Sequence, residues 1–342
     1  MPTETLPASW YTDAAIAERE RHAIFARNWA LFGPEHEVAN PGDYVAQTVN
    51  GWPIVVLRDH DGALRAFHNV CRHRAAALFG EGAGACKTKI TCPYHGWSYE
   101  LDGRLALAPR FGEKLDPEAM GLLALRVEVW RGCIFVCVDP DVPDLMTWLG
   151  SVPEFCAPYP QTDSFTYHGA FTVEGHANWK TYCDNTVEGY HLPFVHKRLS
   201  QAVEGASVEI KGHDDHRLVC FHVAYRGDGA ALRGSSGLWF YRYPGFQAVI
   251  GPTGFKAERI EPVRAGSLRS KSWAWYDAAM DAGATADAFA WAESIVHEDL
   301  GICEAVQRNL EAGAYQSGLL SPAMEEHTAA FQALIRQDLA KA

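Results

Sequence analysis

Two short loops that each carry one cysteine and one histidine constrain this chain more than any other feature. They are Cys71-x-His73 and Cys92-x-x-His95, and each follows a run of residues typical of a strand. Four ligands of this kind can hold a structural zinc. Zinc sites, however, usually pair Cys with Cys and His with His, whereas each loop here supplies one of each. The arrangement therefore favours a larger object held between the loops, a 2Fe-2S cluster with both thiolates on one iron and both imidazoles on the other.

Composition agrees with metal ligation in a reducing compartment. The 342 residues include nine cysteines and fifteen histidines, an odd number of thiols in a chain too long to be a small disulfide scaffold. The net charge of −12 disfavours nucleic acid and an anionic membrane surface as partners. No apolar run approaches the roughly 20 residues of a membrane helix, and the first residues lack a secretory signal. We therefore expect a cytoplasmic protein that binds neither nucleic acid nor membranes.

The first half of the chain changes from a helical to a β-rich pattern. Apolar residues among charges predict a helix over residues 13–31. From about residue 40 to residue 143, short β-rich runs alternate with tight turns such as Asn50-Gly51 and Arg131-Gly132, which predict hairpins. This stretch is typical of a compact all-β domain.

The second half mixes helical and strand patterns. It is helix-like over 179–191, strand-like over 218–225, 238–250 and 268–276, and helical from 287 to the end. We therefore predict an α+β fold whose C-terminal domain has a central antiparallel sheet surrounded by helices. The predicted parts are a helical segment packed on the C-terminal domain (1–40), the all-β domain (41–152) and the C-terminal α+β domain (153–342).

A second cluster of metal-binding side chains lies in the C-terminal domain. Glu188 and His191 are three residues apart and would lie on one face of a helix, which Pro193 should end. His196 would then come from the following turn and reach the same point. Two converging histidines need one carboxylate to form the facial triad of non-haem iron(II), which leaves positions open for dioxygen and substrate. A pair of surface histidines is the alternative, which the apolar neighbours of these residues disfavour.

The third ligand is expected from the helix after Asp287. A carboxylate in an apolar stripe is costly unless it is paired, protonated or bound to a metal. The candidate carboxylate is Asp299, and the alternative is that it is only the buried partner of an Arg or a His. Glu298 and Glu304 fall toward the edges of the stripe and are interpreted as solvated charges. At about 100° per residue, Asp299 lies in the middle of a stripe formed by Ala292, Ile295, Val296, Ile302, Cys303, Val306 and Leu310.

These motifs resemble those of the α (catalytic) subunits of Rieske non-haem iron ring-hydroxylating oxygenases. The similarity is ordered along the chain from about residue 40 to residue 335. The first half resembles the Rieske motif through Cys71-Arg72-His73-Arg74 and Cys92-Pro93-Tyr94-His95-Gly96-Trp97. The second half resembles the catalytic motifs through Asn178-Trp179-Lys180, Asn185-x-x-Glu188-x-Tyr190-His191-x-x-x-x-His196 and Glu298-Asp299-x-x-x-x-Glu304.

The resemblance implies a terminal oxygenase with two metal sites. Electrons from NAD(P)H would arrive through a separate reductase, with or without a ferredoxin, since the chain carries no Gly-rich dinucleotide fingerprint. The substrates would be dioxygen and a small organic molecule. The implied ligands are Cys71, His73, Cys92 and His95 for the 2Fe-2S Rieske cluster, and His191, His196 and Asp299 for mononuclear Fe(II).

The resemblance also implies a head-to-tail homotrimer. Glu188 occupies the family's bridging position, which is usually Asp in the aromatic-ring dioxygenases. It would hydrogen-bond both His191 and His95 of the partner subunit, and so connect the iron of one subunit with the cluster of the next. Asn185 is expected at the same catalytic site, one residue closer to the bridging acid than in the naphthalene-type enzymes.

The substrate class is left open by these motifs. The aromatic side chains of the segment 238–246 could stack on an aromatic substrate or surround a quaternary ammonium by cation–π attraction, although packing in a core or interface is the commoner role of such residues. The segment 298–308 and Glu188 look similar to those of members acting on choline, carnitine or betaines. Aromatic ring hydroxylation and oxidative demethylation are both kept. The strand-like segment 238–246 places Trp239, Tyr241 and Tyr243 on one side, and Phe240 and Arg242 on the other.

Two other classes of protein compete with the oxygenase. One is a Rieske-type electron-transfer protein without oxygenase activity, whose second domain is structural. The other is a zinc-stabilised binding protein without a redox role. The second metal motif speaks against the carrier, and the mixed Cys and His loops speak against zinc.

Overall fold

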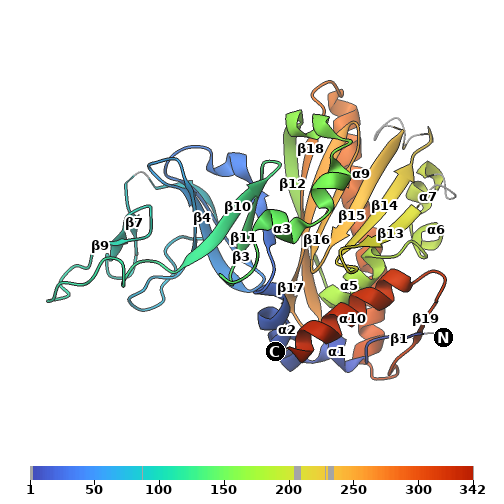
Figure 1. Cartoon of the computed structure of the whole chain (residues 1–342), viewed down its shortest axis with the longest axis horizontal. Helices are drawn as coiled ribbons and strands as arrows, with labels where there is room; N and C mark the ends of the chain where they lie inside the picture. The colour runs from blue at the N-terminus through green and yellow to red at the C-terminus, as the bar shows by residue number, and fades with distance from the viewer. Residues whose placement is uncertain (1–2, 87, 204–208, 228, 230–234, 342) are drawn as a thin grey trace. The chain divides into compact units, whose positions relative to one another are not determined.

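The computed structural model describes residues 3–86, 88–203, 209–227, 229 and 235–341 (Figure 1). The chain divides into two compact units. Unit 1 combines Met1–Phe25 with Met146–Ala342, and unit 2 is Ala26–Leu145. The predicted α+β class, with an all-β domain followed by an α+β domain, is confirmed. None of the helices among the described residues is both long and apolar enough to span a membrane.

Unit 2 is built from two β-sheets. A seven-stranded sheet has the order β2-β11-β10-β5-β4-β3-β6, and a three-stranded sheet has the order β7-β8-β9. The strands of the larger sheet are β2 (Ala30–Pro34), β3 (Asp43–Val49), β4 (Trp52–Arg58), β5 (Leu64–His68), β6 (Gly82–Ala85), β10 (Ala124–Trp130) and β11 (Cys133–Cys137). Those of the smaller sheet are β7 (Ile90–Thr91), β8 (Ser98–Tyr99) and β9 (Leu105–Leu107).

The larger sheet of unit 2 is buried on both faces. Along β4, Ile54 and Val56 belong to one hydrophobic core, whereas Val55 and Leu57 belong to another. Successive side chains of a strand point to opposite faces, so a strand covered on both sides is apolar throughout. The second of these cores also contains the side chains of Cys71 and Cys92.

The two hairpins predicted from Asn-Gly and Arg-Gly turns are present. Asn50 and Gly51 have φ angles of 50° and 83° between β3 and β4, and Arg131 and Gly132 have φ angles of 49° and 68° between β10 and β11. Two consecutive residues in the left-handed region give the turn whose twist matches that of the flanking strands.

The N-terminal helix is shorter than predicted. Instead of running over 13–31, helix α2 (Ala14–Glu20) passes into a π-helical turn (Arg21–Phe25), and β2 then pairs with β11. The strand pairing is a tertiary interaction that local helical periodicity does not reveal. Consequently the units divide after Phe25 and Leu145, whereas the prediction placed its boundaries after residues 40 and 152.

A buried ion pair connects the N-terminal segment to the rest of unit 1. Lys180 Nζ lies 2.6 Å from Glu20 Oε1, and both side chains are fully buried. The indole Nε1 of Trp179 donates to the other oxygen of Glu20 at 2.8 Å. Burial lowers the pKa of Lys180, and the carboxylate of Glu20 opposes that shift. An ionic pair in the interior is retained only when its partners are hydrogen-bonded in this way.

Unit 1 is an antiparallel sheet with helices packed beside it. The strand order is β12-β18-β17-β16-β15-β14-β13, and Figure 1 shows these strands side by side with α10 across their lower end. The strands are β12 (Thr166–Gly175), β13 (Glu209–His213), β14 (Leu218–Ala224), β15 (Ser236–Arg242), β16 (Phe246–Ile250), β17 (Gly254–Arg264) and β18 (Ser267–Tyr276). A two-stranded ribbon pairs β1 (Thr3–Glu4) with β19 (Leu319–Leu320).

The helices of unit 1 include two long ones near the C-terminus. The predicted continuous helix from 287 to the end is wrong, because the helix starts earlier and is interrupted. Asp281 caps α9 by accepting from the backbone N–H groups of Gly283 and Ala284, and the chain leaves the helix before Gly313, whose φ is 72°. Among the described residues, the α-helices with assigned bounds are α1 (Ser9–Thr12), α2, α4 (Val152–Cys156), α5 (Trp179–Thr186), α6 (Leu192–Val195), α7 (Lys197–Ala202), α9 (Ala282–Glu311) and α10 (Glu326–Ala340), with α3 (Leu145–Leu149) at the division between the units.

Candidate metal centres

The two Cys/His loops of unit 2 repeat the same backbone hydrogen-bond pattern. The N–H of Cys71 donates to the carbonyl of Ala76, and the N–H of Ala75 donates back to the carbonyl of Cys71. In the second loop, the N–H of Cys92 donates to the carbonyl of Trp97, and the N–H of Gly96 donates to the carbonyl of Cys92. In both loops the fourth residue after the cysteine has a positive φ, 58° at Ala75 and 72° at Gly96. The two loops therefore present their Cys and His side chains as equivalent halves of one site.

The donor set of these loops fits a two-iron cluster. Cys71 and Cys92 are buried, their thiols interact, and neither forms a disulfide. The rings of His73 and His95 lie 4.7 Å apart between centroids, and the buried Nδ1 of His73 has no hydrogen-bond partner. A buried nitrogen without a partner is costly unless it binds something that the polypeptide does not supply. The thiols lie inside the core, whereas His95 is exposed, which suits electron transfer at the imidazole side.

The same four side chains do not form a compact tetrahedral site. Within the described part of the chain, one group of three or more Cys, His or acidic side chains has its ligand atoms within 4.8 Å of one another, and it lies in unit 1. A single zinc holds its four ligands at about 2.0–2.3 Å, so the ligand atoms would all be close neighbours. The spread of the Cys and His ligands in unit 2 therefore fits a cluster with two metal ions better than zinc.

Tyr99 is expected to tune this cluster. Its hydroxyl lies 3.3 Å from Cys71 Sγ and accepts from the backbone N–H of Arg72 at 3.1 Å. A deprotonated cluster thiolate has no hydrogen, so the Tyr99 hydroxyl would donate, and hydrogen bonds to the sulfurs raise the potential. Tyr99→Phe should lower the reduction potential by about 50 mV, the equivalent of roughly one hydrogen bond in a one-electron couple. A redox titration measures the shift, and an unchanged potential would contradict the assignment of Cys71 as a cluster ligand.

The mononuclear site of unit 1 is assembled from a loop and a helix. Helix α5 ends at Thr186, so the prediction that Glu188 and His191 share a helix face is wrong. Glu188 and His191 lie in the loop that follows, and Pro193 lies in the first turn of the short helix α6 instead of ending a longer helix. The proline ring fixes φ at a value suited to the first turn of a helix, where no backbone donor is needed. His196 then follows directly after α6.

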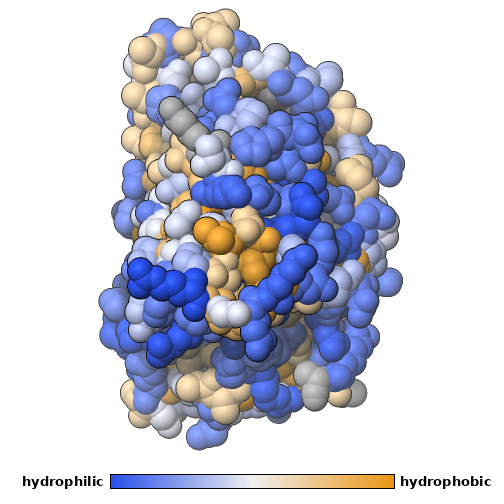
Figure 2. All heavy atoms as spheres, turned by 90° about the vertical axis from the view of Figure 1, so that its left-hand side faces the viewer, coloured by the Kyte–Doolittle hydropathy of each residue, from blue (hydrophilic) through white to orange (hydrophobic). Residues whose placement is uncertain are grey.

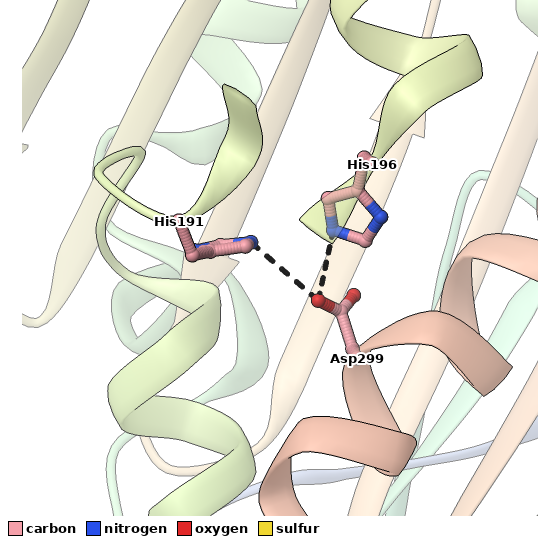
Figure 3. Close-up of side chains that lie close together, drawn as sticks. All are labelled: His191, His196 and Asp299. Atoms are coloured by element: carbon pink, nitrogen blue, oxygen red, sulfur yellow. Dashed lines mark hydrogen bonds and ion pairs between the residues drawn. The ribbon is translucent and has the colours of Figure 1, made fainter. Parts of the chain in front are cut away.

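His191, His196 and Asp299 converge on one point. Asp299 comes from α9, and Figure 3 shows the two imidazoles reaching its carboxylate from separate turns. Asp299 Oδ1 lies 2.9 Å from His196 Nε2 and 3.5 Å from His191 Nε2. All three candidate ligand atoms lie within 4.8 Å of one another. Two imidazoles and one carboxylate in this arrangement fit the facial triad that holds non-haem iron(II).

Each imidazole of the triad has its own glutamate on the opposite ring nitrogen. Glu188 Oε1 lies 2.5 Å from His191 Nδ1, and Glu298 Oε2 lies 2.6 Å from His196 Nδ1. A carboxylate that accepts from Nδ1 leaves Nε2 as the metal-binding atom and fixes the orientation of the ring. The interpretation of Glu298 as a merely solvated charge is wrong. Its side chain is 41% exposed, yet its carboxylate reaches the buried His196.

The carboxylate and the imidazoles of this site stabilise one another's charged forms. Burial by itself would raise the pKa of Asp299, but hydrogen bonds from His191 and His196 outweigh it and hold the pKa at about 2. Burial likewise disfavours the charged form of His191, but Asp299 and Glu188 raise its pKa to about 9. Asn185 donates from Nδ2 to Asp299 Oδ1 at 2.7 Å and so holds the carboxylate in place. A cation at this point would replace the ring protons as the partner of Asp299.

A cavity adjoins the triad, and we call it the triad cavity. Besides the triad, its lining includes Asn185, Glu188, Phe221, Trp239, Gln247 and Lys256. Phe240 and Tyr241 of β15 also line it, so part of the aromatic segment predicted from the sequence lies at the site. Tyr243 and Arg242 do not line it. Tyr243 is buried and packs against Phe331, and Arg242 is buried near the carbonyl of Trp148.

Two protein-family models match this chain. Residues 28–127 match the Rieske 2Fe-2S domain, and residues 162–341 match the catalytic domain of the ring-hydroxylating α subunit. The second match covers the segment with the triad, and the first covers both Cys/His loops.

Relatives with known activities match over most of the chain. The chloroplastic choline monooxygenase of Beta vulgaris is 32% identical over 331 residues, which are 92% of this chain and 72% of that protein. The carnitine monooxygenase oxygenase subunit of Escherichia coli strain K12 is 38% identical over 206 residues, 58% of this chain and 54% of that protein. The structure of the quaternary ammonium Rieske monooxygenase CntA in complex with L-carnitine superposes with a TM-score of 0.85 at 28% identity, covering 98% of this chain and 96% of the other.

Proposed function

This chain belongs to the Rieske non-haem iron ring-hydroxylating oxygenases as an α (catalytic) subunit, and we propose that it hydroxylates a carbon bonded to the nitrogen of a small ammonium compound. As a member of this family it is an oxidoreductase that incorporates oxygen from O2. It uses a 2Fe-2S Rieske cluster and a mononuclear non-haem iron, and it receives electrons from a separate reductase. The choice of an ammonium compound over an aromatic ring is the proposal.

The aromatic lining of the triad cavity carries this choice. Phe221, Trp239 and Phe240 line the space beside the triad, and the indole N–H of Trp239 is already used in a 2.6 Å hydrogen bond to Tyr225. Aromatic rings whose polar atoms are occupied attract a quaternary ammonium through their faces. The relatives named for choline and carnitine support the same choice.

The polypeptide would contribute binding and orientation. The iron would be held by His191, His196 and Asp299. The cluster would be held by Cys71, His73, Cys92 and His95. When bound, the cluster supplies single electrons and the iron activates dioxygen beside the substrate. Glu188 and Glu298 accept hydrogen bonds from the Nδ1 atoms of the two ligand imidazoles, and Asn185 donates a hydrogen bond that holds Asp299 in place. The aromatic side chains would exclude water and place the N-alkyl group next to the triad.

The reaction balances as a monooxygenation. One oxygen atom enters a C–H bond next to nitrogen, the other leaves as water, and two electrons and two protons complete the balance. An N-methyl group that gains a hydroxyl in this way leaves as formaldehyde, and the amine that remains has lost one methyl group. Formaldehyde release is therefore a specific readout of this function.

The proposed assembly is a head-to-tail homotrimer in the cytoplasm. Glu188 lines the triad cavity and also a second cavity of unit 1 that none of the three triad residues lines, so it can be reached from two sides. Unit 2 exposes Tyr94, Leu107 and Phe111, and Figure 2 shows a face with a small hydrophobic patch inside a hydrophilic surround. Both features support a contact in which His95 of the partner subunit meets Glu188.

Turnover with a generic reductase tests the proposed function. Holoprotein, reductase, NADH and a panel of trimethylammonium compounds should consume O2 and release formaldehyde or another aldehyde, while aromatic hydrocarbons of similar size should not be hydroxylated. Hydroxylation of the aromatic compounds alone would overturn the choice of substrate. Reduction of the cluster without O2 uptake on any compound would favour the electron-transfer alternative.

A further inference from the structure

Lys256 supplies an ammonium group at one side of the triad cavity. We propose that it binds the carboxylate of a zwitterionic substrate, so that the molecule carries both an N-alkylated ammonium and a carboxylate. This inference rests on the proposed function and narrows its substrate class. Lys256 belongs to β17, and its side chain is 13% exposed.

The hydrogen bonds around Lys256 leave part of its capacity unused. Nζ donates to Glu258 Oε2 at 2.6 Å, and Glu258 is its one hydrogen-bond partner among the residues that the structure describes. Glu258 is fully buried and also accepts from Ser270 Oγ at 2.6 Å and Tyr182 OH at 3.3 Å. The buried carboxylate is thus well supplied with donors. An ammonium has three donors, so Lys256 keeps N–H groups for a ligand in the cavity that it lines.

The wall of the triad cavity includes carboxylates at the triad and one lysine, Lys256. Lys256 also lines an adjoining cavity together with Val249 and Ala292, whereas none of the three triad residues lines that space. Lys256 therefore lies where the triad cavity meets this adjoining space, which the triad does not line. At the triad, the carboxylates of Asp299, Glu188 and Glu298 outnumber the two positive charges of iron(II). A substrate with its ammonium toward the triad and its carboxylate toward Lys256 complements both kinds of charge.

A substrate that is only cationic fits this cavity less well. It would offer no acceptor to the N–H groups of Lys256 that are not bonded to Glu258, and a buried donor without an acceptor is costly. A zwitterion supplies that acceptor in a charge-assisted hydrogen bond. Gln247 of β16 lines the same cavity and is paired in register with Glu258 of β17. Its side-chain amide has no hydrogen-bond partner among the described residues. It offers the carboxylate a second donor.

A matched pair of substrates tests the role of Lys256. We compare a trimethylammonium carboxylate with its methyl ester, which keeps the ammonium and removes the anion. Wild-type holoprotein should prefer the acid in kcat/KM by about 10- to 100-fold, the range of one charge-assisted hydrogen bond. The difference should appear mainly in KM, and calorimetric binding of the acid should show it without turnover.

The variant must avoid an unpaired buried carboxylate. Removing Lys256 alone would leave Glu258 buried without its cation, so the test uses Lys256→Met together with Glu258→Gln. This double variant should lose the preference for the acid, whereas Lys256→Arg should retain most of it. Lys114→Met together with Glu113→Gln is the matched control, because it removes one exposed lysine and one exposed glutamate of unit 2 and, like the test variant, leaves the net charge unchanged.

The outcomes separate this inference from the proposed function. If wild type turns over acid and ester equally well, or if the double variant keeps the full preference, the role of Lys256 is refuted while the proposed function stands. If neither compound is oxidised by protein with both metal sites loaded, and an aromatic compound is hydroxylated, the proposed function itself is refuted. Thermal unfolding of each variant shows whether a loss of binding merely reflects a loss of folding.

Discussion

Asp299→Ala is expected to lose the mononuclear iron, keep the 2Fe-2S cluster, and fall in activity by about three orders of magnitude or more. The carboxylate is the one anionic member of the triad, and it accepts from His191, His196 and Asn185 through the same oxygen. A metal at a reaction centre contributes several kcal/mol, and each 1.36 kcal/mol is tenfold in rate. Iron analysis with visible spectroscopy measures both parts of the prediction.

A matched variant on the same helix controls for this substitution. Asp287→Ala removes an exposed carboxylate of α9 that pairs with Arg198 at the surface, and it should leave iron content and activity unchanged. Full iron stoichiometry in Asp299→Ala would refute its assignment as a ligand. Loss of both the iron and the cluster would indicate misfolding, which Asp299→Asn, a substitution of nearly the same shape, then distinguishes from loss of the ligand.

Glu188→Gln is expected to bind both metals when iron is supplied in excess, but to turn over about 100-fold more slowly, within the range of losses known for residues that orient metal ligands. Glu188 accepts from His191 Nδ1, and its other oxygen accepts from the backbone N–H groups of Tyr190 and His191. The amide keeps an acceptor for the local turn but loses the charge of the proposed bridge. Rapid mixing of reduced protein with substrate and O2 should show slow oxidation of the cluster.

Glu298→Gln is the matched control for the proposed bridge. It changes the other carboxylate that orients an imidazole of the triad, the partner of His196. Both substitutions should weaken iron binding by about 10- to 100-fold. With iron restored, Glu298→Gln should recover the rate of cluster oxidation, whereas Glu188→Gln should not. Recovery in both variants would mean that Glu188 only orients His191.

The fold class could be predicted because its signals are local. The turns at Asn50-Gly51 and Arg131-Gly132 need left-handed backbone at two successive residues, and the sequence provides residues suited to a tight hairpin there. The position of Asp299 on the apolar side of α9 followed from helical periodicity. The same periodicity was less accurate for two apolar members of the stripe, since Ile302 and Val306 are 48% and 40% exposed.

The features that were missed depend on tertiary contacts. The strand at Ala30–Pro34 exists because β11 pairs with it, which a helical pattern continuing from Ala14 does not reveal. Glu298 lies beside Asp299 in the sequence, yet its contact with His196 joins residues that are far apart in the chain. Lys256 has no motif around it, and its proposed role depends on its place in the wall of the triad cavity, which the sequence does not reveal.

Metal and sulfide analysis of the purified protein tests the central claim of two different iron sites in one chain. We expect brown protein with about three irons and about two acid-labile sulfides per chain, one iron being lost in Asp299→Ala while the sulfide stays. Colourless protein with stoichiometric zinc and no labile sulfide would contradict the account.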